Sequence, residues 1–453
     1  MNTLSPTTSI PRLSTEIYSI PLDDNRYLIY APLHGSALLT DAAEADLLNT
    51  VPAGTNIDLL RRLHSINDVA ESPPLRKMSG PPLPTAITLL LTTACNLRCS
   101  YCYASAGARQ AEFMPLETAK RGIDFITANA KKKNAIARNV GQQGVNELKV
   151  AYHGGGEPSL HWQMLTASFA YAQQKAENAG LRVSGSMISN GVLGDDRIDW
   201  IIANMDKVTI SFDGLPSIQD QQRPTKSGRG SSSAVMHTLR RLDAAGFPYV
   251  IRMSATEAYL EQLADAVTFI GQQFQPQRIQ IEPVYPMGRG QTMPSVTTSR
   301  FIQAYREART VAKKWHVKLD YSASRLDKLS HHFCGVTQDA FSLTAAGNVT
   351  ACHSCFAEND SLAKVFLYGK PHEHRQGYQF DMPVLEKLRN RAIQHPDGCQ
   401  DCFAKWHCAG GCYYYALHAN ETGQSGGSAR CRITRALLVD EILEHLSTLT
   451  GGT

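Results

Sequence analysis

The chain has 453 residues, of which 43% are hydrophobic and 19% charged, with 45 Lys and Arg against 41 Asp and Glu. A chain of this length forms roughly two to four structural units and buries a large core. A net charge of +4 lacks the strong basic excess typical of nucleic-acid-binding domains. No apolar run approaches the roughly 20 residues that span a bilayer, and the N-terminus has no secretory pattern. We therefore expect a soluble, cytoplasmic protein without nucleic-acid or membrane partners.

Residues 1–84 are predicted to form a small α+β module. Two short strands, Arg26–Tyr30 and Ala37–Thr40, precede Asp41, which is placed to cap an Ala- and Leu-rich helix. A second helix is expected over Asn56–Ser65, and the Pro-rich stretch before Pro84 is typical of a linker.

Residues 85–300 alternate between strand and helix, which indicates a parallel sheet with right-handed crossovers. The predicted strands are Ile87–Thr92, Leu148–His153, Arg182–Ile188, Val208–Phe212, Val250–Ser254 and Ile279–Val284. The predicted helices are Leu116–Ala130, Leu160–Ala179, Ser232–Ala245 and Leu260–Phe274, with Lys131–Lys133 ending the first of them. Since these strands are too few for a closed eight-fold barrel, the expected fold class is α/β, a partial (β/α)6 barrel. Residues 301–330 are predicted to be a linker and residues 331–453 a cysteine-rich domain.

The eleven cysteines fall into two groups. Cys95, Cys99 and Cys102 follow the first predicted barrel strand with CxxxCxxC spacing, and the other eight lie between Cys334 and Cys431. In a reducing compartment such groups are more often metal ligands than disulfides, and an odd number excludes complete pairing. Three thiolates on one short loop suit an iron–sulfur cube with one iron left open. Spacing alone leaves two alternatives, a zinc site with a distant fourth ligand and unconnected thiols.

The first group, with Tyr101 before its last cysteine, resembles the signature of the radical S-adenosylmethionine superfamily. The resemblance extends to Gly155, Gly156 and Glu157 after the second strand, where that family has a Gly-Gly-Glu motif. It implies a [4Fe–4S] cluster on the three cysteines whose open iron binds S-adenosylmethionine, with the Glu157 carboxylate accepting from the ammonium group of this ligand. Related enzymes contact the ligand's ribose and carboxylate from later strand ends. These positions here are Asn190, Ser211 and Arg252, for which ordinary turn or surface roles are equally open.

The second group resembles the SPASM extension of radical S-adenosylmethionine enzymes that modify peptides. The matching pattern is a Cys, Gly, Cys block, then CxxCxxxxxCxxxC, then a late single cysteine. The resemblance implies two auxiliary [4Fe–4S] clusters, the second of them held by Cys399, Cys402, Cys408 and Cys431. The first would take Cys334, Cys352 and Cys412, and Cys355 is the candidate for its fourth ligand. A free thiol at Cys355, or ligation by His331, His332 or His353, are the alternatives for that position.

These resemblances imply an enzyme that forms a 5′-deoxyadenosyl radical and installs a carbon–carbon or thioether crosslink in a ribosomally made precursor peptide. Its partners would be that peptide and an external one-electron reductant such as a flavodoxin or ferredoxin. Anaerobic sulfatase maturation ranks second, because members of that group carry Asp where this chain has His353. Residues 1–84 vaguely resemble a leader-peptide-binding domain, with a structural cap as the alternative. An electron-transfer protein and a zinc-stabilised binding module are the other classes considered. No residue is assigned as the catalytic base; Asp213, Arg223, Glu282 and Tyr285 are expected near the barrel opening in ordinary loop or core roles.

Overall fold

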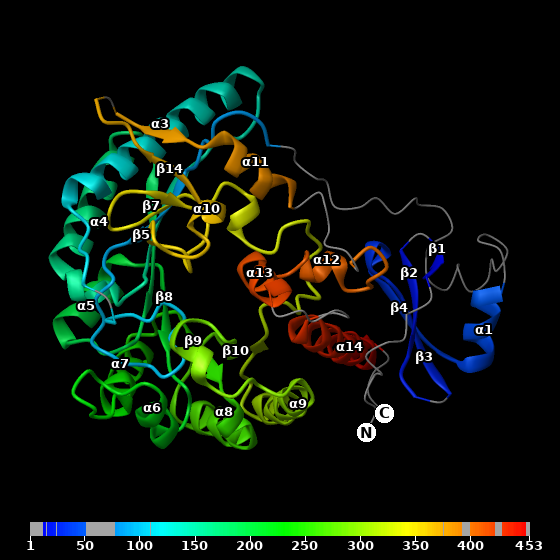
Figure 1. Cartoon of the computed structure of the whole chain (residues 1–453). Helices are drawn as coiled ribbons and strands as arrows, with labels where there is room; N and C mark the ends of the chain where they lie inside the picture. The colour runs from blue at the N-terminus through cyan, green and yellow to red at the C-terminus, as the bar shows by residue number, and fades with distance from the viewer. Residues whose placement is uncertain are drawn as a thin grey trace. The chain divides into compact units, whose positions relative to one another are not determined.

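The computed structural model describes residues 12–14, 16–23, 25–50, 78–108, 110–374, 376–391, 399–421 and 428–449. The chain divides into two compact units (Figure 1). The first unit combines residues 1–78, 321–334 and 390–453, and the second combines residues 79–320 and 335–389. Both units are therefore assembled from separate stretches of sequence.

The second unit is built on the predicted parallel sheet. Six strands lie in chain order with parallel neighbours: β5 (Ala86–Leu90), β6 (Glu147–His153), β7 (Arg182–Ser189), β8 (Lys207–Ser211), β9 (Tyr249–Ala255) and β10 (Arg278–Pro283). Their inward side chains, such as Leu89, Val150 and Ile210, are fully buried. The open sheet of six strand–helix repeats confirms the partial barrel.

Helices follow one another around the outside of these strands (Figure 1). They are α3 (Leu116–Asn139), α4 (Trp162–Glu177), α5 (Asp195–Asn204), α6 (Pro216–Gln222), α7 (Ser232–Ala244), α8 (Leu263–Gln273) and α9 (Thr298–Lys314). The expectation that Lys131–Lys133 end a helix is wrong: α3 continues to Asn139, because good helix formers follow and the first glycine is Gly141. Helix α9 also occupies most of the first half of the segment expected to be a linker.

Short strands extend the sheet at both edges. Strand β11 (Leu319–Asp320) lies parallel to β10, and β12 (Ser342–Leu343) lies parallel to β5. Three antiparallel strands continue outward from β12: β13 (Val349–Thr350), β14 (Leu367–Pro371) and β15 (Tyr378–Phe380). Helix α10 (Ala363–Phe366) directly precedes β14, and α11 (Met382–Asn390) follows β15. Residues 335–389, expected in a single C-terminal cysteine-rich domain, thus belong to the same compact unit as the barrel strands, and their four strands extend the barrel sheet.

The first unit contains an antiparallel sheet in the order β1 (Arg12–Ser14), β2 (Ile17–Pro21), β3 (Arg26–Ala31) and β4 (Ser36–Asp41). Helix α1 (Ala42–Thr50) follows, and the Asp41 carboxylate accepts from the Glu44 N–H at 2.8 Å, which confirms the predicted cap. The helix expected over 56–65 lies outside the described residues. The C-terminal part of the unit contributes α12 (Lys405–Cys408), α13 (Tyr413–Glu421) and α14 (Ala429–Leu449).

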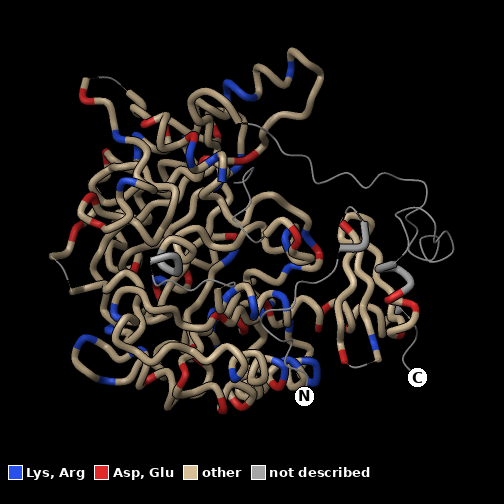
Figure 2. The backbone as a smooth tube through the Cα atoms, turned by 45° about the vertical axis from the view of Figure 1, so that its right-hand side comes forward, with Lys and Arg blue, Asp and Glu red and all other residues tan. Residues whose placement is uncertain are grey.

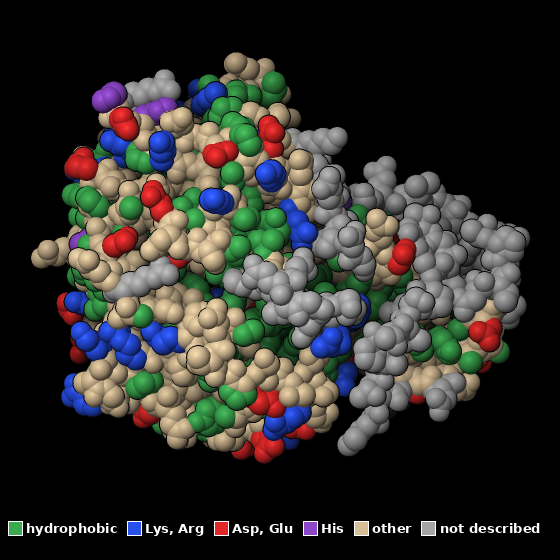
Figure 3. All heavy atoms as spheres, viewed as in Figure 1, with side chains coloured by type: hydrophobic (Ala, Val, Ile, Leu, Met, Phe, Trp, Pro, Cys, Tyr) green, Lys and Arg blue, Asp and Glu red, His purple; other side chains and the backbone are tan. Residues whose placement is uncertain are grey.

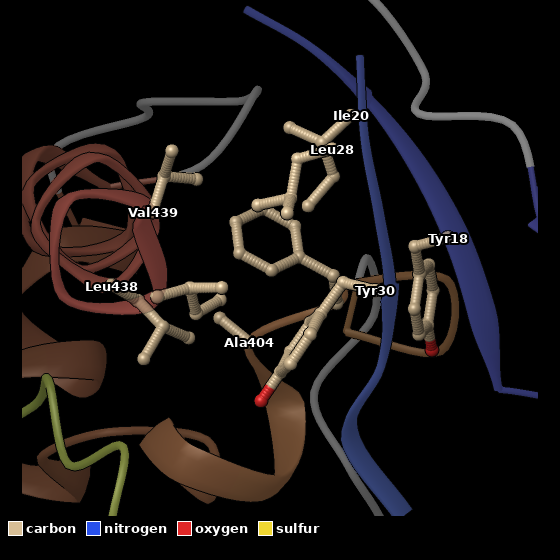
Figure 4. Close-up of a cluster of buried hydrophobic side chains, with 9 residues drawn as sticks. Tyr18, Ile20, Leu28, Tyr30, Ala404, Leu438 and Val439 are labelled. Carbon is tan, nitrogen blue, oxygen red and sulfur yellow. The ribbon is translucent and has the colours of Figure 1, made fainter. Parts of the chain in front are cut away.

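A hydrophobic cluster joins the two ends of the chain within the first unit (Figure 4). It consists of Tyr18, Ile20, Leu28, Tyr30, Phe403, Ala404, Leu438, Val439 and Ile442. The N-terminal sheet and the cysteine-rich C-terminal segment therefore share one core.

Charged side chains of both signs are interspersed along the backbone (Figure 2) and over the face of the molecule shown in Figure 3. This distribution fits the nearly balanced composition. Among the described residues, no helix has the length and apolar character needed to cross a membrane.

Candidate functional site

The first three cysteines lie on a loop that leaves the carboxyl end of β5. In parallel α/β sheets, ligands bind at this end of the strands. Thr92 fastens the start of the loop, since its hydroxyl donates to the Glu112 carbonyl at 2.6 Å and accepts from the Ala94 N–H at 3.0 Å. The loop thus begins from a fixed point directly before Cys95.

A second segment pairs with the cysteine loop along its length. Backbone N–H groups of Arg98 and Ser100 donate to the carbonyls of Pro224 and Gln222 at 2.7 and 2.9 Å, and Lys226 N–H donates to Asn96 O at 2.8 Å. This segment follows α6, so a barrel loop distant in sequence sets the conformation around Cys99.

Arg289, after β10, braces the loop from the opposite side. Its guanidinium donates to the carbonyls of Cys99 at 2.8 Å and Ala106 at 3.0 Å, and its N–H donates to Cys102 O at 3.0 Å. The preceding Gly288 has φ +53°, and a Cβ there would overlap with the carbonyls of Cys102 and Tyr103. Sequence reasoning missed Arg289, because it belongs to no spaced motif.

A buried ion pair lies beneath Tyr101. The Tyr101 hydroxyl donates to Asp213, which also accepts from Arg223 Nε at 2.9 Å and from the Ser254 N–H at 3.0 Å. The carboxylate and guanidinium side chains are 1% and 8% exposed, and the Arg223 guanidinium lies 5.1 Å from the Tyr101 ring centre. Asp213 and Arg223 therefore have the structural role that we expected, and they fix the aromatic residue of the cysteine motif.

The glycines after β6 allow this strand end to approach the cysteine loop. A Cβ on Gly156 would overlap with the Ala94 carbonyl, and the Glu157 N–H donates to that same carbonyl at 2.8 Å. Gly155 lies against the Phe356 ring. The two predicted motifs, although more than fifty residues apart, are thus brought into direct contact.

The Glu157 carboxylate is buried and already bonded within the protein. It accepts from the Ser159 N–H at 3.1 Å, the Ser189 hydroxyl at 2.9 Å and the Asn190 N–H at 2.7 Å. Burial raises the pKa of Glu157 despite these bonds. Its predicted contact with an ammonium group stays a prediction, and the structure adds that Glu157 ties β6 to the end of β7.

The other predicted ligand contacts lie on neighbouring strand ends. The Asn190 side chain donates to Asn96 Oδ1 at 2.7 Å and lies 3.9 Å from Cys95 Sγ. Ser211 and Arg252 are direct register partners on β8 and β9. All three belong to the carboxyl edge of the sheet that carries the cysteine loop.

Burial and neighbouring thiolates both act on the thiols of the cysteine loop. Burial raises the pKa of Cys95 to about 12 and that of Cys99 as well, and neighbouring thiolates add to both shifts. A metal centre supplies the positive charge that replaces such protons. Within the described ranges, no three His, Cys, Asp or Glu side chains form a site for a single metal ion.

Cys352 and Cys355 belong to a loop in the same unit as these residues. The Thr350 hydroxyl, at the end of β13, lies 3.0 and 2.8 Å from their carbonyls, and Cys355 is fully buried. The His353 ring packs against the ring of His153 at the end of β6, with ring centres 4.6 Å apart and ring planes tilted by 40°. Burial lowers the pKa of His353 to about 4 and that of His153 well below its ordinary value. The His353 side chain also contacts the Ser342 hydroxyl at 3.0 Å.

The remaining cysteines belong to the first unit. Burial raises the pKa of Cys408 to about 12, and the charges of Cys431, Cys402 and Cys399 add to this shift, so these four thiols are near one another. Two positive charges oppose such increases: Arg430 lowers the pKa of Cys408, and Arg435 lowers the pKa of Cys402. Arg325 donates to the carbonyls of His407 and Phe333, the residues before Cys408 and Cys334. Cys334 and Cys412 lie in the first unit and Cys352 and Cys355 in the second, so their common cluster stays a prediction.

Comparison with known proteins gives the class. Residues 89–265 match the model of the Radical SAM superfamily, which contains both the cysteine loop and the Gly-Gly-Glu turn. The chain is 27% identical to the sporulation killing factor maturation protein SkfB of Bacillus subtilis over 41% of this chain and 39% of that protein. It is 22% identical to a serine-type anaerobic sulfatase-maturating enzyme of Klebsiella aerogenes over 78% of this chain and 84% of that one. It is 25% identical to the mycofactocin maturase MftC of Mycobacterium tuberculosis over 73% and 78% of the two chains.

Solved structures share the fold. The enzyme anSMEcpe with bound AdoMet has a TM-score of 0.57 at 15% identity, covering 73% of this chain and 86% of that one. Streptococcus suis SuiB bound to the precursor peptide SuiA has a TM-score of 0.52 at 14% identity, covering 90% and 96% of the two chains.

Residues 89–265 therefore carry a radical SAM domain, as the cysteine loop predicted. Such a domain implies a [4Fe–4S] cluster and S-adenosylmethionine. The match covers only 39% of the length of SkfB and 57% of the length of a second curated relative.

Proposed function

We propose that this chain is a radical S-adenosylmethionine maturase that installs a carbon–carbon or thioether crosslink in a ribosomally made precursor peptide. The observation that carries the radical chemistry is the contact between the braced cysteine loop and the Gly155–Glu157 turn at the carboxyl edge of the sheet. Relatives named as maturases, among them SkfB and MftC, support a peptide substrate.

In this proposal Cys95, Cys99 and Cys102 would hold the cluster, and Gly155, Gly156, Asn190, Ser211 and Arg252 would bind S-adenosylmethionine. The two groups, when bound and reduced, supply a 5′-deoxyadenosyl radical able to take hydrogen from an unactivated carbon. The protein contributes position and exclusion of water. Arg289 and the 222–226 segment hold the loop, while Tyr101 is fixed through Asp213.

Two auxiliary [4Fe–4S] clusters belong to the same proposal. Cys399, Cys402, Cys408 and Cys431 would hold one, which the proximity of these thiols supports. Cys334, Cys352, Cys355 and Cys412 would hold the other, with burial of Cys355 beside Cys352 supporting its inclusion. The clusters would accept the second electron, which the substrate radical loses as it is oxidised. Binding of the substrate through an open iron is the other possible role, and it requires Cys355 to be a free thiol. The proposed functional regions are a radical SAM region near 85–300 and an auxiliary-cluster region near 331–453. A flavodoxin or ferredoxin as reductant and a cytoplasmic location complete the proposal.

Sulfatase maturation is the second candidate, favoured by the long match to the Klebsiella enzyme. The residue after Cys352 argues against sulfatase maturation. Sulfatase-maturing enzymes, which the sequence resembles, carry an Asp base at the position that is His353 here. A synthetic sulfatase peptide with Ser or Cys at the target position separates the two: formation of formylglycine by the reduced protein would support maturation of sulfatases and exclude our first choice.

The N-terminal sheet is proposed to bind the leader of the precursor peptide by strand addition, which needs an accessible sheet edge. Its outer strands are β1 and β4, and Leu39 on β4 is 45% exposed. A Leu39→Asp change should weaken binding of a precursor peptide that the wild-type chain binds, whereas Ile136→Asp, on the exposed face of α3, should not. Equal affinity of the two variants would contradict leader binding at β4.

The radical chemistry is tested by anaerobic reconstitution, reduction and assay of 5′-deoxyadenosine formed from S-adenosylmethionine. Joint replacement of Cys95, Cys99 and Cys102 by Ala should abolish this product and leave the auxiliary clusters bound. Retained cleavage would refute the assignment of the first loop. A colourless protein containing zinc would refute the iron clusters as a whole, and clusters without cleavage would indicate an electron-transfer protein.

A further inference from the structure

The five residues between Cys402 and Cys408 are all buried. They are Phe403, Ala404, Lys405, Trp406 and His407, none more than 7% exposed. Residues 325–331 and α14 cover them in part, and the rest of their contacts come from the N-terminal sheet, nearly 400 positions away in sequence.

Apolar contacts form one half of this interface. Phe403 and Ala404 belong to the cluster that includes Tyr18, Leu28 and Tyr30. Figure 4 shows Ala404 and Tyr30 on facing sides of this cluster, with the Tyr30 hydroxyl directed towards the C-terminal segment. Cys402 itself packs against the cluster. Burial of this kind excludes water from one side of the segment from Cys402 to Cys408, which we call the ligand segment.

Glu16 provides a charged contact. Its carboxylate accepts from Lys405 Nζ, from Trp406 Nε1 at 2.7 Å and from the Tyr18 hydroxyl at 3.0 Å. The side chains of Glu16 and Lys405 are 7% and 8% exposed. Glu16 has φ +68°, a conformation that a non-glycine residue rarely adopts unless its surroundings fix it. Two adjacent residues of the ligand segment are therefore held by one carboxylate.

Tyr30 provides a polar contact to the residue before Cys408. Its hydroxyl lies 2.5 Å from Nε2 of His407, the residue before Cys408. Nδ1 of His407 faces the Arg325 carbonyl at 2.9 Å and so carries the proton, which leaves Nε2 to accept from Tyr30. Both ring nitrogens are thus used to fix the backbone next to Cys408.

We propose that the N-terminal sheet forms the outer wall of the site made by Cys399, Cys402, Cys408 and Cys431, with Glu16 and Tyr30 as positioning residues for it. The inference rests on the proposed function, since it takes these cysteines as ligands of an auxiliary cluster. Residues that orient metal ligands affect affinity and potential without touching the metal. By fixing the five residues between Cys402 and Cys408, the sheet sets the separation of these two thiolates and limits access to the cluster.

The test uses the full-length chain, reconstituted anaerobically, with Cys95, Cys99 and Cys102 replaced by Ala so that only auxiliary clusters remain. Tyr30→Phe removes one hydroxyl and keeps the ring, and Glu16→Gln removes one charge. Tyr27→Phe, on the same strand, and Asp46→Asn, exposed on α1, are the matched controls. Ile20→Val weakens the shared core without changing a polar contact. The measurements are iron release to a ferrous chelator and the electron paramagnetic resonance signal during a redox titration.

Tyr30→Phe and Glu16→Gln should release one cluster's share of the iron about tenfold faster than the parent and shift the signal and potential of that cluster alone. The second auxiliary cluster and both matched controls should behave as in the parent. The double variant with Lys405→Gln and Glu16→Gln should release iron no faster than either single variant, because both changes remove the same contact.

Folded Tyr30→Phe protein with parental iron release and an unchanged signal would overturn the positioning role and leave the proposed function intact. Equal acceleration by Ile20→Val would also overturn it, because general core stability would then explain the effect. Absence of auxiliary iron from the triple-Ala parent would instead refute the proposed clusters. If Glu16→Gln fails to fold, Tyr30→Phe decides the outcome.

Discussion

At the scale of single residues, the cysteine loop depends on side chains that are not part of its motif. Three cysteines define the loop in sequence, whereas Arg289, Asp213 and Arg223 fix its conformation. Hydrogen bonds from charged groups to buried partners are worth roughly 1.5–3 kcal/mol each. The site is therefore sensitive at positions where sequence motifs alone predict no effect.

Arg289 provides the clearest prediction at this scale. Arg289→Gln removes the donors to the Cys99 and Ala106 carbonyls, so the cleavage of S-adenosylmethionine should fall by about tenfold or more while the auxiliary clusters stay bound. The assay is 5′-deoxyadenosine formation together with iron content. Arg278→Gln, at the start of β10 and in a half-exposed pair with Asp320, is the control and should change neither. Equal rates in the two variants would show that Arg289 does not brace the loop.

At the scale of elements, the end of β6 and the start of the cysteine loop must approach within contact distance. Gly156 is the residue that permits this, since a Cβ would overlap with Ala94 O. The approach is a property of the sheet edge, because β5 and β6 are adjacent parallel strands in register.

Gly156→Ala should therefore displace the loop, abolish detectable cleavage of S-adenosylmethionine and destabilise the second unit by about 1–3 kcal/mol. Gly246→Ala gives the comparison: it has φ +59° but open space around a Cβ, so it should cost about 1 kcal/mol through backbone strain and leave cleavage unchanged. Denaturant unfolding and the cleavage assay measure both. Full activity of Gly156→Ala would mean that the loop can move aside without loss.

The elements that sequence predicts well are those whose signal is local. The six barrel strands lie within a few residues of their predicted bounds, because each is a short apolar run ending at a turn. Strands β12–β15 were not predicted, since strands of two to five residues carry little periodicity and pair through the sheet. Helix α9 was missed because its strongly charged sequence resembles a solvated connection. The contacts of Glu16 with Lys405 and Trp406 could not be predicted at all, since no local pattern relates residues 389 positions apart.

At the scale of the whole molecule, the two groups of cysteines fall in different compact units except for Cys352 and Cys355. Iron binding and folding are linked wherever a site does not exist in the unfolded chain. The stability of each unit should consequently fall when the cysteines of that unit are replaced.

Calorimetry of the anaerobic protein should show this separation. Joint Cys399→Ala and Cys402→Ala should lower the unfolding temperature of the first unit by several degrees, whereas Cys95→Ala with Cys99→Ala should lower that of the second. Full chelation should lower both transitions. A single transition that shifts equally with either pair would indicate that the two units unfold as one.

The shared core of the first unit also determines when it can form during synthesis. Strands β2 and β3 leave the ribosome early, but Tyr30 meets His407 only after 377 further residues have been made. At usual rates of translation this delay is roughly 20–75 s. During that time the apolar face of Tyr18, Ile20 and Leu28 has no partner from the C-terminal segment. The core of this sheet can thus be completed only long after its strands are made, so nascent chains of this protein are expected to need chaperone cover over the sheet.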